Sequence, residues 1–428
     1  MDKPVTFAIC GCGNRGLETY AAYQSAHPEQ MRVIAGADCR PERLAILRER
    51  YDVPVENCFA TGEELLDQPR LADVLVIATQ DRQHVDQAVK ALEKGYHLLL
   101  EKPISPSLAQ CRRLLDKAHE TGRAVTVCHV LRYTKFYETL EAILRRGDIG
   151  KLETLEAAEN VAYWHYAHSF VRGNWRRSGE TSPIILAKSC HDMDILRWLA
   201  GGKCLKVQSF GGLDYFRAEC APEGAALYCL DGCGCKEGCP YDAEKIYITA
   251  AHSGVRSIGK AWPCRVVAED PTEEALYDAL RAGPYGRCVF HCDNDVADHQ
   301  TVNLEFENGV HAVFTLTAFT ERCHRTIKAT GTLGEVQGDI SKGKLILRRF
   351  GKPEEVIDVG CSAGNTGHGG GDAGLMDHMC RLAAGEMDGC PTSIDASVES
   401  HVMALAAEAS RLAGGEVIQL SAFEKSAQ

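Results

Sequence analysis

Three glycines near the start of the chain have the spacing that a dinucleotide-binding turn requires. Gly11, Gly13 and Gly16 follow a short apolar run at 5–10 and precede a predicted helix at 17–26. In such a turn, the first glycine permits tight bending, the second lets the backbone approach a pyrophosphate, and the third lets the helix pack on the strand. The free N–H groups and the dipole at the helix N-terminus favour an anion. We therefore predict a dinucleotide site here.

A carboxylate follows the second predicted strand. Asp38 comes directly after the apolar run 31–37, about 20 residues beyond the glycines, where a carboxylate can accept hydrogen bonds from the ribose hydroxyls of an adenosine. Arg40 could instead contact a 2′-phosphate, so the sequence favours NAD and leaves NADP open. Asn14 and Arg15 lie within the glycine turn, and we assign them to the same cofactor site.

Polar side chains also follow three later predicted strands, at 74–78, 97–100 and 124–128. Continuous apolar strands of this kind predict a parallel sheet that is covered on both faces, and ligands bind such sheets at the carboxyl ends of the strands. The alternative is that these residues are polar only because turns meet water. We assign Thr79, His84, Glu101 and Lys102 to the cofactor, and His129 and Arg132 to the substrate.

The pattern changes after the sixth predicted strand. A strand-like stretch at 151–162 and a hairpin signal at Asn308-Gly309 predict a largely antiparallel sheet with one packed face. The other face is a natural surface for a homodimer or homotetramer. We expect an α/β chain with an N-terminal Rossmann domain (1–128), a second α/β domain with a large, mostly antiparallel open sheet (129–360), and a C-terminal loop and helices that pack back on the core (361–428).

Composition excludes several classes of function. The 428 residues are 45% hydrophobic, which suits two or three folded domains. The formal net charge of −12 argues against a protein that binds nucleic acid or an anionic membrane surface. No apolar run approaches the roughly 20 residues that span a bilayer, and the first strand starts too early for a signal peptide. We expect a cytoplasmic protein.

Twenty cysteines in a long chain without an export signal indicate buried thiols rather than disulfides. Four that lie close together, Cys229, Cys233, Cys235 and Cys239, could close a tetrahedral zinc site that fixes a loop with little core of its own. Their spacing does not match paired Cys-x-x-Cys knuckles. Buried or redox-sensitive free thiols are therefore the alternative.

One segment, 163–175, is dense in aromatic rings and hydrogen-bonding groups of the kind that bind sugars. Its histidines could also be metal ligands, but they lack a neighbouring carboxylate, so hydrogen bonds to substrate hydroxyls are the preferred interpretation. His368, in a glycine-rich loop at 364–371, either caps the substrate pocket or links the sheet to the last helices. The residues of the first segment that we assign to the substrate are Tyr163, His165, His168, Arg172 and Trp175, with Asn174 beside them.

Together these motifs resemble a known family. The GCGNRG turn at 11–16, Asp38, the Glu-Lys-Pro triplet at 101–103 and the segment CHDMDILRWLAGG at 190–202 are similar to the Gfo/Idh/MocA family of nicotinamide-dependent oxidoreductases. The resemblance implies a Rossmann domain and a second domain whose open sheet forms dimers or tetramers. It also implies hydride transfer at a hydroxyl-bearing carbon of a sugar, a cyclitol or a related compound.

The resemblance also assigns roles to residues. Lys102 would contact the substrate hydroxyl beside the nicotinamide and stabilise alkoxide character on its oxygen. Glu101 would approach the nicotinamide ribose. His191 would be the general base that takes the hydroxyl proton. The alternative for His191 is a residue at a helix N-terminus that is satisfied by the backbone.

The chain departs from the family pattern four residues before this histidine. Many members carry an aspartate there, and this chain has Ala187 followed by Lys188. Asp194 could replace the missing carboxylate as the partner of His191 if the helix has already begun. Lys188 could face the substrate, which would suit an anionic sugar, or it could be a surface lysine.

Three functions follow from these observations. The leading prediction is a dehydrogenase that uses NAD, or NADP, and acts on a CH–OH group of a carbohydrate. The second is an NAD-dependent glycosidase, which oxidises a ring carbon, eliminates the aglycone, adds water and returns the hydride. The third is a regulator that senses a nucleotide without turnover, and the polar residues at several strand ends disfavour it.

Overall fold

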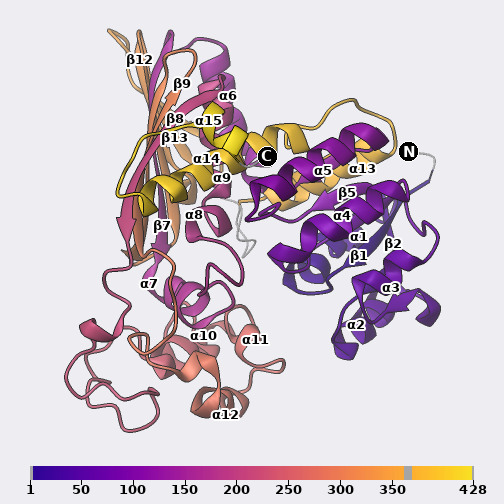
Figure 1. Cartoon of the computed structure of the whole chain (residues 1–428), viewed down its shortest axis with the longest axis vertical. Coiled ribbons are helices and arrows are strands. Elements are labelled where there is room, and N and C mark those ends of the chain that lie inside the picture. Colours follow the sequence, from indigo (N-terminus) through magenta and orange to yellow (C-terminus); the bar gives the residue numbers. More distant parts are fainter. Residues whose placement is uncertain (1–2, 361–368, 427–428) are drawn as a thin grey trace.

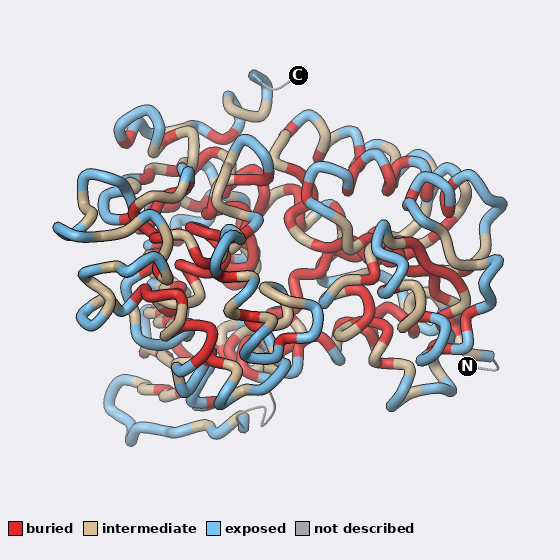
Figure 2. Tube along the Cα trace, turned by 90° about the horizontal axis from the view of Figure 1, so that it is seen from below, coloured by how far each residue is buried: buried red, intermediate tan, exposed pale blue. Residues whose placement is uncertain are grey.

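The computed structural model describes residues 3–360 and 369–426. Figure 1 shows two bodies side by side, an N-terminal α/β body and a second body built on a tall sheet. Buried chain fills the middle of both bodies, and exposed chain forms their loops (Figure 2). The predicted role of His368 concerns a residue outside the described ranges.

The N-terminal body contains a six-stranded sheet in the order β3-β2-β1-β4-β5-β6, and every pair in it is parallel. This is the strand order of a dinucleotide-binding Rossmann fold, so the predicted fold is confirmed. Strands β4 and β5 consist almost entirely of buried apolar residues, as expected for a sheet that is covered on both faces. The strands are β1 Val5–Cys10, β2 Met31–Ala37, β3 Cys58–Phe59, β4 Val74–Ile77, β5 His97–Leu100 and β6 Val125–Val127.

Alternate residues of β1 pack into two different cores, one on each face of this sheet. Ala8 joins the core beneath α4 and α5, whereas Phe7 and Ile9 join a core on the other face that includes Leu47 of α2 and Met379 of α13. The helices of this body are α1 Tyr23–Ala26, α2 Pro41–Tyr51, α3 Gly62–Asp67, α4 His84–Glu93 and α5 Leu108–Thr121.

The segment after the glycine turn differs from the prediction. Instead of one helix at 17–26, a π-helical turn, Asn14–Ala21, precedes the short α1. The amide N–H of Leu17 donates to the carbonyl of Gly13 at 3.0 Å, so the helical turns start within the glycine motif itself. π-Helical turns are rare and occur mostly at functional sites.

The second body is built on a nine-stranded sheet in the order β14-β13-β12-β11-β7-β10-β9-β8-β15. All its pairs are antiparallel except β7 with β10, which confirms a mostly antiparallel sheet. The Asn308-Gly309 turn joins β9 to β10 as predicted. The strands are β7 Leu152–Ala162, β8 Cys204–Gly212, β9 His299–Phe306, β10 His311–Thr320, β11 His324–Gly331, β12 Gly334–Asp339, β13 Lys344–Arg349, β14 Glu355–Asp358 and β15 Ile418–Gln419.

Helices cover one face of this sheet and join it to the Rossmann body. α14 lies against β8, α9 and α5, and α13 packs on the Rossmann sheet. The predicted domain boundaries at 128/129 and 360/361 stay a prediction. No helix within the described ranges is long and apolar enough to cross a membrane. The helices are α6 Lys135–Arg145, α7 Tyr163–Tyr166, α8 Ile184–Ala187, α9 Cys190–Ala200, α13 Gly371–Ala383, α14 Ile394–Leu412 and α15 Leu420–Ser426.

Between β8 and β9 the chain leaves the sheet and forms a separate lobe, residues 213–298, which we call the insertion lobe. It lies at the bottom of Figure 1. Part of it has its own small core, made of Ile248, Cys264 and Leu276. Sequence analysis did not anticipate this lobe as a unit. Its helices are α10 Val255–Ile258, α11 Cys264–Val267 and α12 Glu273–Ala282, preceded by a π-helical turn, Lys245–Thr249.

Candidate functional site

The three glycines of the turn have different surroundings, which match their three predicted tasks. Gly11 has a φ of +92°, and a Cβ there would lie 2.5 Å from the carbonyl oxygen of Ala78. A Cβ on Gly16 would lie 2.0 Å from the carbonyl oxygen of Gly11. A Cβ on Gly13 would meet nothing within 4 Å. Gly11 and Gly16 are therefore required by the turn itself, whereas Gly13 borders open space.

Asp38 ends β2 beside this turn. One carboxylate oxygen accepts the amide N–H of Cys12 at 2.8 Å, and the other accepts the amide N–H of Arg40 at 2.9 Å. These bonds fix the carboxylate next to the glycines, and its remaining lone pairs can accept hydrogen bonds from a ribose diol.

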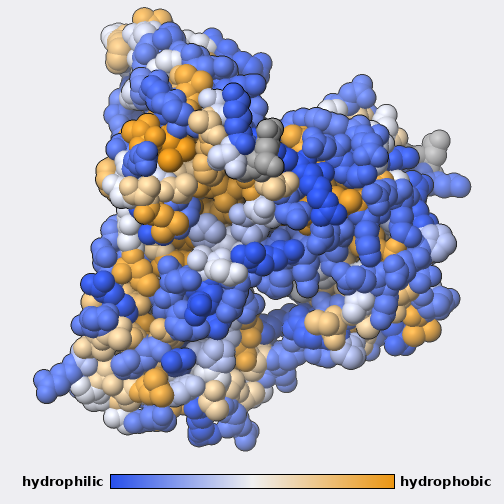
Figure 3. All heavy atoms as spheres, in the orientation of Figure 1, coloured by the Kyte–Doolittle hydropathy of each residue, from blue (hydrophilic) through white to orange (hydrophobic). Residues whose placement is uncertain are grey.

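A cavity of about 900 Å³ connects these residues, a size within the range of small-molecule and cofactor sites. One wall comes from the Rossmann body and the other from the segment around His168 and from the insertion lobe, which contributes Trp262 and Tyr285. Figure 3 shows the opening between the lobe and the Rossmann body. The predicted site residues that line this cavity are Gly11, Gly13, Asn14, Arg15, Asp38, Arg40, Thr79, His168, Asn174 and Trp175.

Glu101 is buried and holds the glycine turn to the end of β5. Its carboxylate accepts hydrogen bonds from Nε of Arg15 and from the hydroxyl of Tyr20, both at 2.5 Å, and from the amide N–H of Lys102 at 3.0 Å. Burial opposes its ionisation, but the charges of Arg15 and Lys102 outweigh burial and hold the pKa of Glu101 below its usual value. Arg15 also pairs with Asp372 of α13 at 2.7 Å.

Lys102 reaches from the Rossmann body to the second body. Its Nζ donates to the carbonyl of Ala187 at 2.8 Å, and this contact brings it to the segment that carries Lys188 and His191. The peptide bond to Pro103 is cis. Lys102 and His191 are not among the residues that line the 900 Å³ cavity. His165, whose ring lies 4.8 Å from that of Trp262 in the cavity wall, is close enough to Lys188 and Lys102 for their charges to affect its pKa.

Burial lowers the pKa of His165 well below its usual value, and the neighbouring cations Lys188 and Lys102 add to the effect. The imidazole is therefore neutral at physiological pH. Its Nδ1 lies 3.2 Å from the thiol of Cys323. A neutral ring at this position can take part in hydrogen bonds with hydroxyl groups without adding charge to the site.

Three buried histidine rings form a row beside Lys102. The ring of His129 lies 5.7 Å from that of His191 and 5.7 Å from that of His401. His191 is in the first turn of α9 and is 3% exposed. Within residues 3–360 and 369–426, neither ring nitrogen of His129 has a hydrogen-bond partner, and burial lowers its pKa. A neutral His129 places no positive charge beside His191.

His401 was missed by sequence analysis. Its Nε2 accepts the amide N–H of Ile104 at 2.8 Å, and its Nδ1 donates to the carbonyl of Ser397 at 2.7 Å. It therefore fixes the chain just after the Glu-Lys-Pro turn. A lone histidine inside an otherwise ordinary helical stretch carries no signal of this role.

His84 lies under the same turn and not on the cavity. Its Nδ1 is 2.8 Å from the carbonyl of Pro103, its Nε2 is 3.1 Å from the carbonyl of Thr79, and the residue is 1% exposed. A cofactor role was predicted for it, whereas its contacts join two strand-end loops to each other.

Lys188 lies next to two carboxylates that the sequence did not single out. Its Nζ is 3.3 Å from Glu159, and Arg325 contacts both Glu159 at 2.7 Å and Asp192 at 2.8 Å. Burial raises the pKa of Asp192 to about 6, with Arg325 opposing the shift. Lys188 is thus neither a surface lysine nor an unpaired cation, because its side chain is 20% exposed and pairs with Glu159 of β7.

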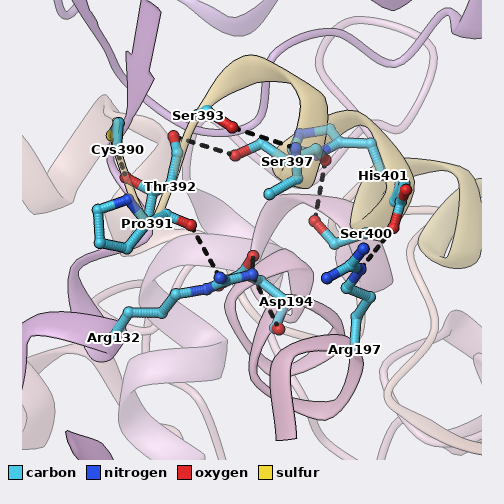
Figure 4. Close-up of polar contacts among 12 residues, drawn as sticks. Arg132, Asp194, Arg197, Cys390, Pro391, Thr392, Ser393, Ser397, Ser400 and His401 are labelled. Carbon is cyan, nitrogen blue, oxygen red and sulfur yellow. Dashed lines mark hydrogen bonds and ion pairs between the residues drawn. The ribbon is translucent and has the colours of Figure 1, made fainter. Parts of the chain in front are cut away.

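Asp194 and Arg132 form a buried pair instead of facing a ligand. Arg132 donates to both carboxylate oxygens of Asp194, at 2.6 and 2.7 Å, and to the carbonyl of Pro391 at 2.8 Å (Figure 4). Their side chains are 4% and 1% exposed. Asp194 was predicted to orient His191 and Arg132 to bind substrate, but the structure engages them with each other to join α9 to the start of α14.

Arg172 is likewise fully enclosed. It donates to the carbonyls of Arg287 at 2.7 Å and Tyr241 at 2.8 Å, and thereby anchors the insertion lobe. His168 contacts the hydroxyl of Tyr247 at 2.9 Å, and Tyr163 is half-buried with its ring 6.1 Å from that of His252. In the segment 163–175, Arg172 therefore serves the lobe, whereas His168 and Trp175 face the cavity.

The zinc prediction is not supported. Cys229, Cys233, Cys235 and Cys239 do line one small cavity beside Arg172. Two of these thiols have other partners: Cys235 donates to the carbonyl of Glu223, and Cys229 accepts from Arg172. Across the described ranges, no group of three or more His, Cys, Asp or Glu side chains is placed to hold a metal ion.

The N-terminal part of the chain is similar to a known family of oxidoreductases. The model of an oxidoreductase family with an NAD-binding Rossmann fold, GFO_IDH_MocA, matches residues 5–129. Residues 5–129, the Rossmann part of the chain, are therefore similar to the Gfo/Idh/MocA oxidoreductases. This match bears out the resemblance that the glycine turn, Asp38 and the Glu-Lys-Pro triplet indicate.

Individual relatives extend this result. The chain is 22% identical to YteT of Bacillus subtilis over 390 residues, which cover 87% of each chain. It is 33% identical to glycosyl hydrolase family 109 protein 2 of Phocaeicola vulgatus over 159 residues, which cover 36% of this chain and 38% of that protein. This chain shares its fold with the crystal structure of an oxidoreductase from Agrobacterium radiobacter in complex with NAD⁺, L-tartaric acid and magnesium. The TM-score is 0.70 and the identity is 15%, and the match covers 98% of this chain and 99% of that one.

Proposed function

We propose that this chain is a Gfo/Idh/MocA oxidoreductase, an NAD-dependent dehydrogenase that acts on a CH–OH group of a sugar, a cyclitol or a related compound. The observation that carries the proposal is the position of Lys102. The half-buried Lys102 follows β5, and its Nζ is held by the carbonyl of Ala187. Its amide N–H is bound by Glu101, the same carboxylate that holds Arg15 of the glycine turn.

The residues present fit NAD. Gly13 leaves open space at the turn where a pyrophosphate binds, and Asp38 offers a fixed carboxylate to the ribose diol. When bound, the nicotinamide accepts or returns the hydride. The chain itself supplies the remaining chemistry, which is the stabilisation of charge on the substrate oxygen and the movement of its proton.

Lys102 supplies the charge and His191 moves the proton in this proposal. The ammonium of Lys102 stabilises the negative charge that develops on the substrate oxygen as the carbon loses hydride. His191 takes the hydroxyl proton, and the neutral His129 beside it does not raise the cost of the imidazolium that forms.

We further propose that the substrate is a neutral polyol rather than an acid. The sequence left open whether Lys188 recognises an anionic sugar. Two cations, Lys188 and Arg325, stand in the cluster, and two carboxylates, Glu159 and Asp192, are paired with them. Buried cations that already have carboxylate partners gain little from a further anion.

The test is the Lys102→Ala variant. It is expected to lose at least about a hundredfold in turnover on whichever polyol the wild type oxidises, because one stabilising charge is removed from the transition state. NAD⁺ affinity, measured by calorimetry, is expected to change by less than about threefold. Turnover is followed by the near-ultraviolet absorbance of NADH across a panel of aldoses, uronic acids and inositols. An unimpaired variant would eliminate the mechanism, and faster turnover of uronic acids would eliminate the neutral substrate.

An NAD-dependent glycosidase is the second candidate. It is favoured by the 33% identity to the family 109 glycosyl hydrolase, which covers 38% of that protein. Aryl glycosides separate the two functions, because a glycosidase releases the aglycone with no net NADH, whereas a dehydrogenase accumulates NADH. Binding of NAD⁺ without turnover on polyols or glycosides would instead indicate the regulator.

We also propose that the uncovered face of the nine-stranded sheet joins copies of the chain. Val313 and Phe319 of β10 are each 45% exposed, and they alternate with the buried Phe314 and Leu316. Phe210 of β8 lies in the same cross-strand row as Thr315 and is 51% exposed. Val313→Glu is expected to shift the mass measured by light scattering towards the monomer, and an unchanged mass would contradict this surface. A cytoplasmic location stays a prediction.

A further inference from the structure

The insertion lobe contacts the Rossmann body at the adenosine end of the cavity. Glu269, which lies between α11 and α12 of the lobe, approaches two arginines that follow β2. Its carboxylate is 3.0 Å from Nη2 of Arg43 and 3.5 Å from Nη1 of Arg40. All three residues line the 900 Å³ cavity together with Asp38. The lobe thus closes the end of the cavity that contains Asp38, the carboxylate assigned to the ribose.

Without the lobe, the residues at this end of the site would suit either NAD or NADP. In Rossmann domains, an acidic residue after the second strand accepts from the ribose 2′-hydroxyl of NAD, whereas a nearby arginine accommodates the 2′-phosphate of NADP. This chain has both Asp38 and Arg40, and the structure adds Arg43. Arg43 is buried, with a side chain 6% exposed, and its Nη1 lies 4.0 Å from a carboxylate oxygen of Glu18. Within the described part of the chain, its Nε and Nη1 have no hydrogen-bond partner. Two guanidiniums in this position are the groups that bind a phosphate.

Glu269 changes the balance between NAD and NADP, because its carboxylate already pairs with Arg40 and Arg43. A 2′-phosphate placed beside the ribose would meet Asp38 and Glu269 together and would have to displace Glu269 from both arginines. A 2′-hydroxyl requires no displacement and can donate to Asp38. The contact between Glu18 of the Rossmann body and Arg265 of the lobe, at 3.6 Å, supports the same closed arrangement.

We propose that Glu269, supplied by the insertion lobe, makes the cofactor site selective for NAD over NADP by neutralising Arg40 and Arg43. This inference rests on the proposed NAD-dependent function. It assigns cofactor choice to a residue 226 positions away from Arg43 in the sequence, outside the Rossmann motif.

The experiment measures the dissociation constants of NAD⁺ and NADP⁺ by isothermal titration calorimetry on the full-length wild type and on Glu269→Gln. Wild type is expected to bind NAD⁺ at least about a hundredfold more tightly than NADP⁺. Glu269→Gln keeps the side-chain shape but removes the charge of the lobe from both arginines, which keep the longer contacts of Arg40 with Asp38 at 3.6 Å and of Arg43 with Glu18 at 4.0 Å. It is therefore expected to tighten NADP⁺ about tenfold and to change NAD⁺ less than about threefold. Arg43→Ala added to Glu269→Gln is expected to remove the gain.

Glu273→Gln is the matched control, because Glu273 lies on the same lobe but pairs with Arg256 of the lobe itself, at 3.0 Å. It is expected to leave the preference unchanged. Suppose that Glu269→Gln still binds NAD⁺, but the ratio of its dissociation constants for NADP⁺ and NAD⁺ stays within about threefold of the wild-type ratio. The inference about Glu269 then fails, whereas the proposed function stands. Equal weakening of both cofactors also overturns the inference, because such a loss indicates only that the lobe has detached. If wild type binds neither cofactor, the proposed function fails with it.

Discussion

The two walls of the cavity are built in opposite ways. The Rossmann wall is made by short, contiguous motifs on parallel strands with fully buried cores, and Gly11, Gly13, Gly16 and Asp38 reach their places through local turn geometry. The insertion-lobe wall comes from a stretch of short helices, and part of it has a core of only three fully buried apolar residues. On the first wall, residues close in sequence determine the positions of the site residues. On the second wall, these positions depend on contacts between residues far apart in sequence, such as those of Arg172 and Glu269.

The largest expected difference between the two walls is in stability. Leu99 of β5 and Leu276 of α12 are both 0% exposed, one in the Rossmann core and one in the small lobe core. Truncating a buried leucine costs about 2–5 kcal/mol. Leu99→Ala is expected to lower the free energy of global unfolding by this amount. Leu276→Ala is expected to raise hydrogen exchange mainly in the lobe, because a local core can open without the rest. Equal protection loss in both bodies would show that the lobe is not a separate unit.

A pair of glycine substitutions sharpens the same comparison. Gly16→Ala places a Cβ 2.0 Å from a backbone oxygen that cannot move aside, so we expect a loss of about 3 kcal/mol in the free energy of unfolding in urea. Gly238 in the lobe is the matched control, since a Cβ there would meet nothing within 4 Å and its φ lies outside the left-handed region. Gly238→Ala is expected to change stability by less than about 0.5 kcal/mol. A stable Gly16→Ala protein would refute the assigned packing role.

The pH dependence of stability tests the histidine row behind Lys102. Burial, aided by His129, lowers the pKa of His401 to about 3. In the unfolded chain this histidine has a pKa near 6.5, so between pH 3 and pH 6.5 the unfolded chain binds more protons than the native state. The contribution of His401 to the free energy of unfolding is therefore complete above pH 6.5 and is lost as the pH falls below that value. The loss from this residue between pH 7 and pH 5 is about 2 kcal/mol. His401→Gln is expected to flatten the stability curve by that amount. The exposed His311 is the control, and a His311→Gln protein should retain the full slope.

The fold and the cofactor half of the site could be predicted from the sequence because their signals are contiguous. The glycine turn, Asp38 and the parallel strands are each readable within a few residues, and the Asn308-Gly309 hairpin is of the same kind. The roles given to Asp194 and Arg132 could not be predicted, because spacing along a helix shows which residues share a face but not which neighbouring element that face meets. Asp194 faces Arg132, and the carboxylate that contacts Lys188 is Glu159, on a strand.

The insertion lobe illustrates the same limit on a larger scale. Its cysteines suggested a metal site because they are close in sequence, but Cys235 donates to a backbone carbonyl, Cys229 accepts from Arg172, and no group of side chains in the described ranges is placed to hold a metal ion. Glu269 had no sequence signal at all, since its meaning depends on two arginines in another body. Closeness in sequence therefore gave an unsupported prediction for the lobe cysteines. The contact of Glu269 with Arg40 and Arg43 could not be predicted, because these residues are far apart in the sequence.

The smallest predicted effect separates binding from folding at a single position. Gly13 borders open space, and its φ of −80° is accessible to any residue, so Gly13→Ala is expected to change the free energy of unfolding by less than about 0.5 kcal/mol. The added methyl group enters the space assigned to the pyrophosphate, so NAD⁺ affinity measured by calorimetry is expected to fall about tenfold. Glycine at this position would then be kept for the ligand alone, unlike Gly11 and Gly16. If NAD⁺ affinity were unchanged in a folded Gly13→Ala protein, the pyrophosphate would have to bind elsewhere, and the Rossmann wall would lose its claim to the cofactor.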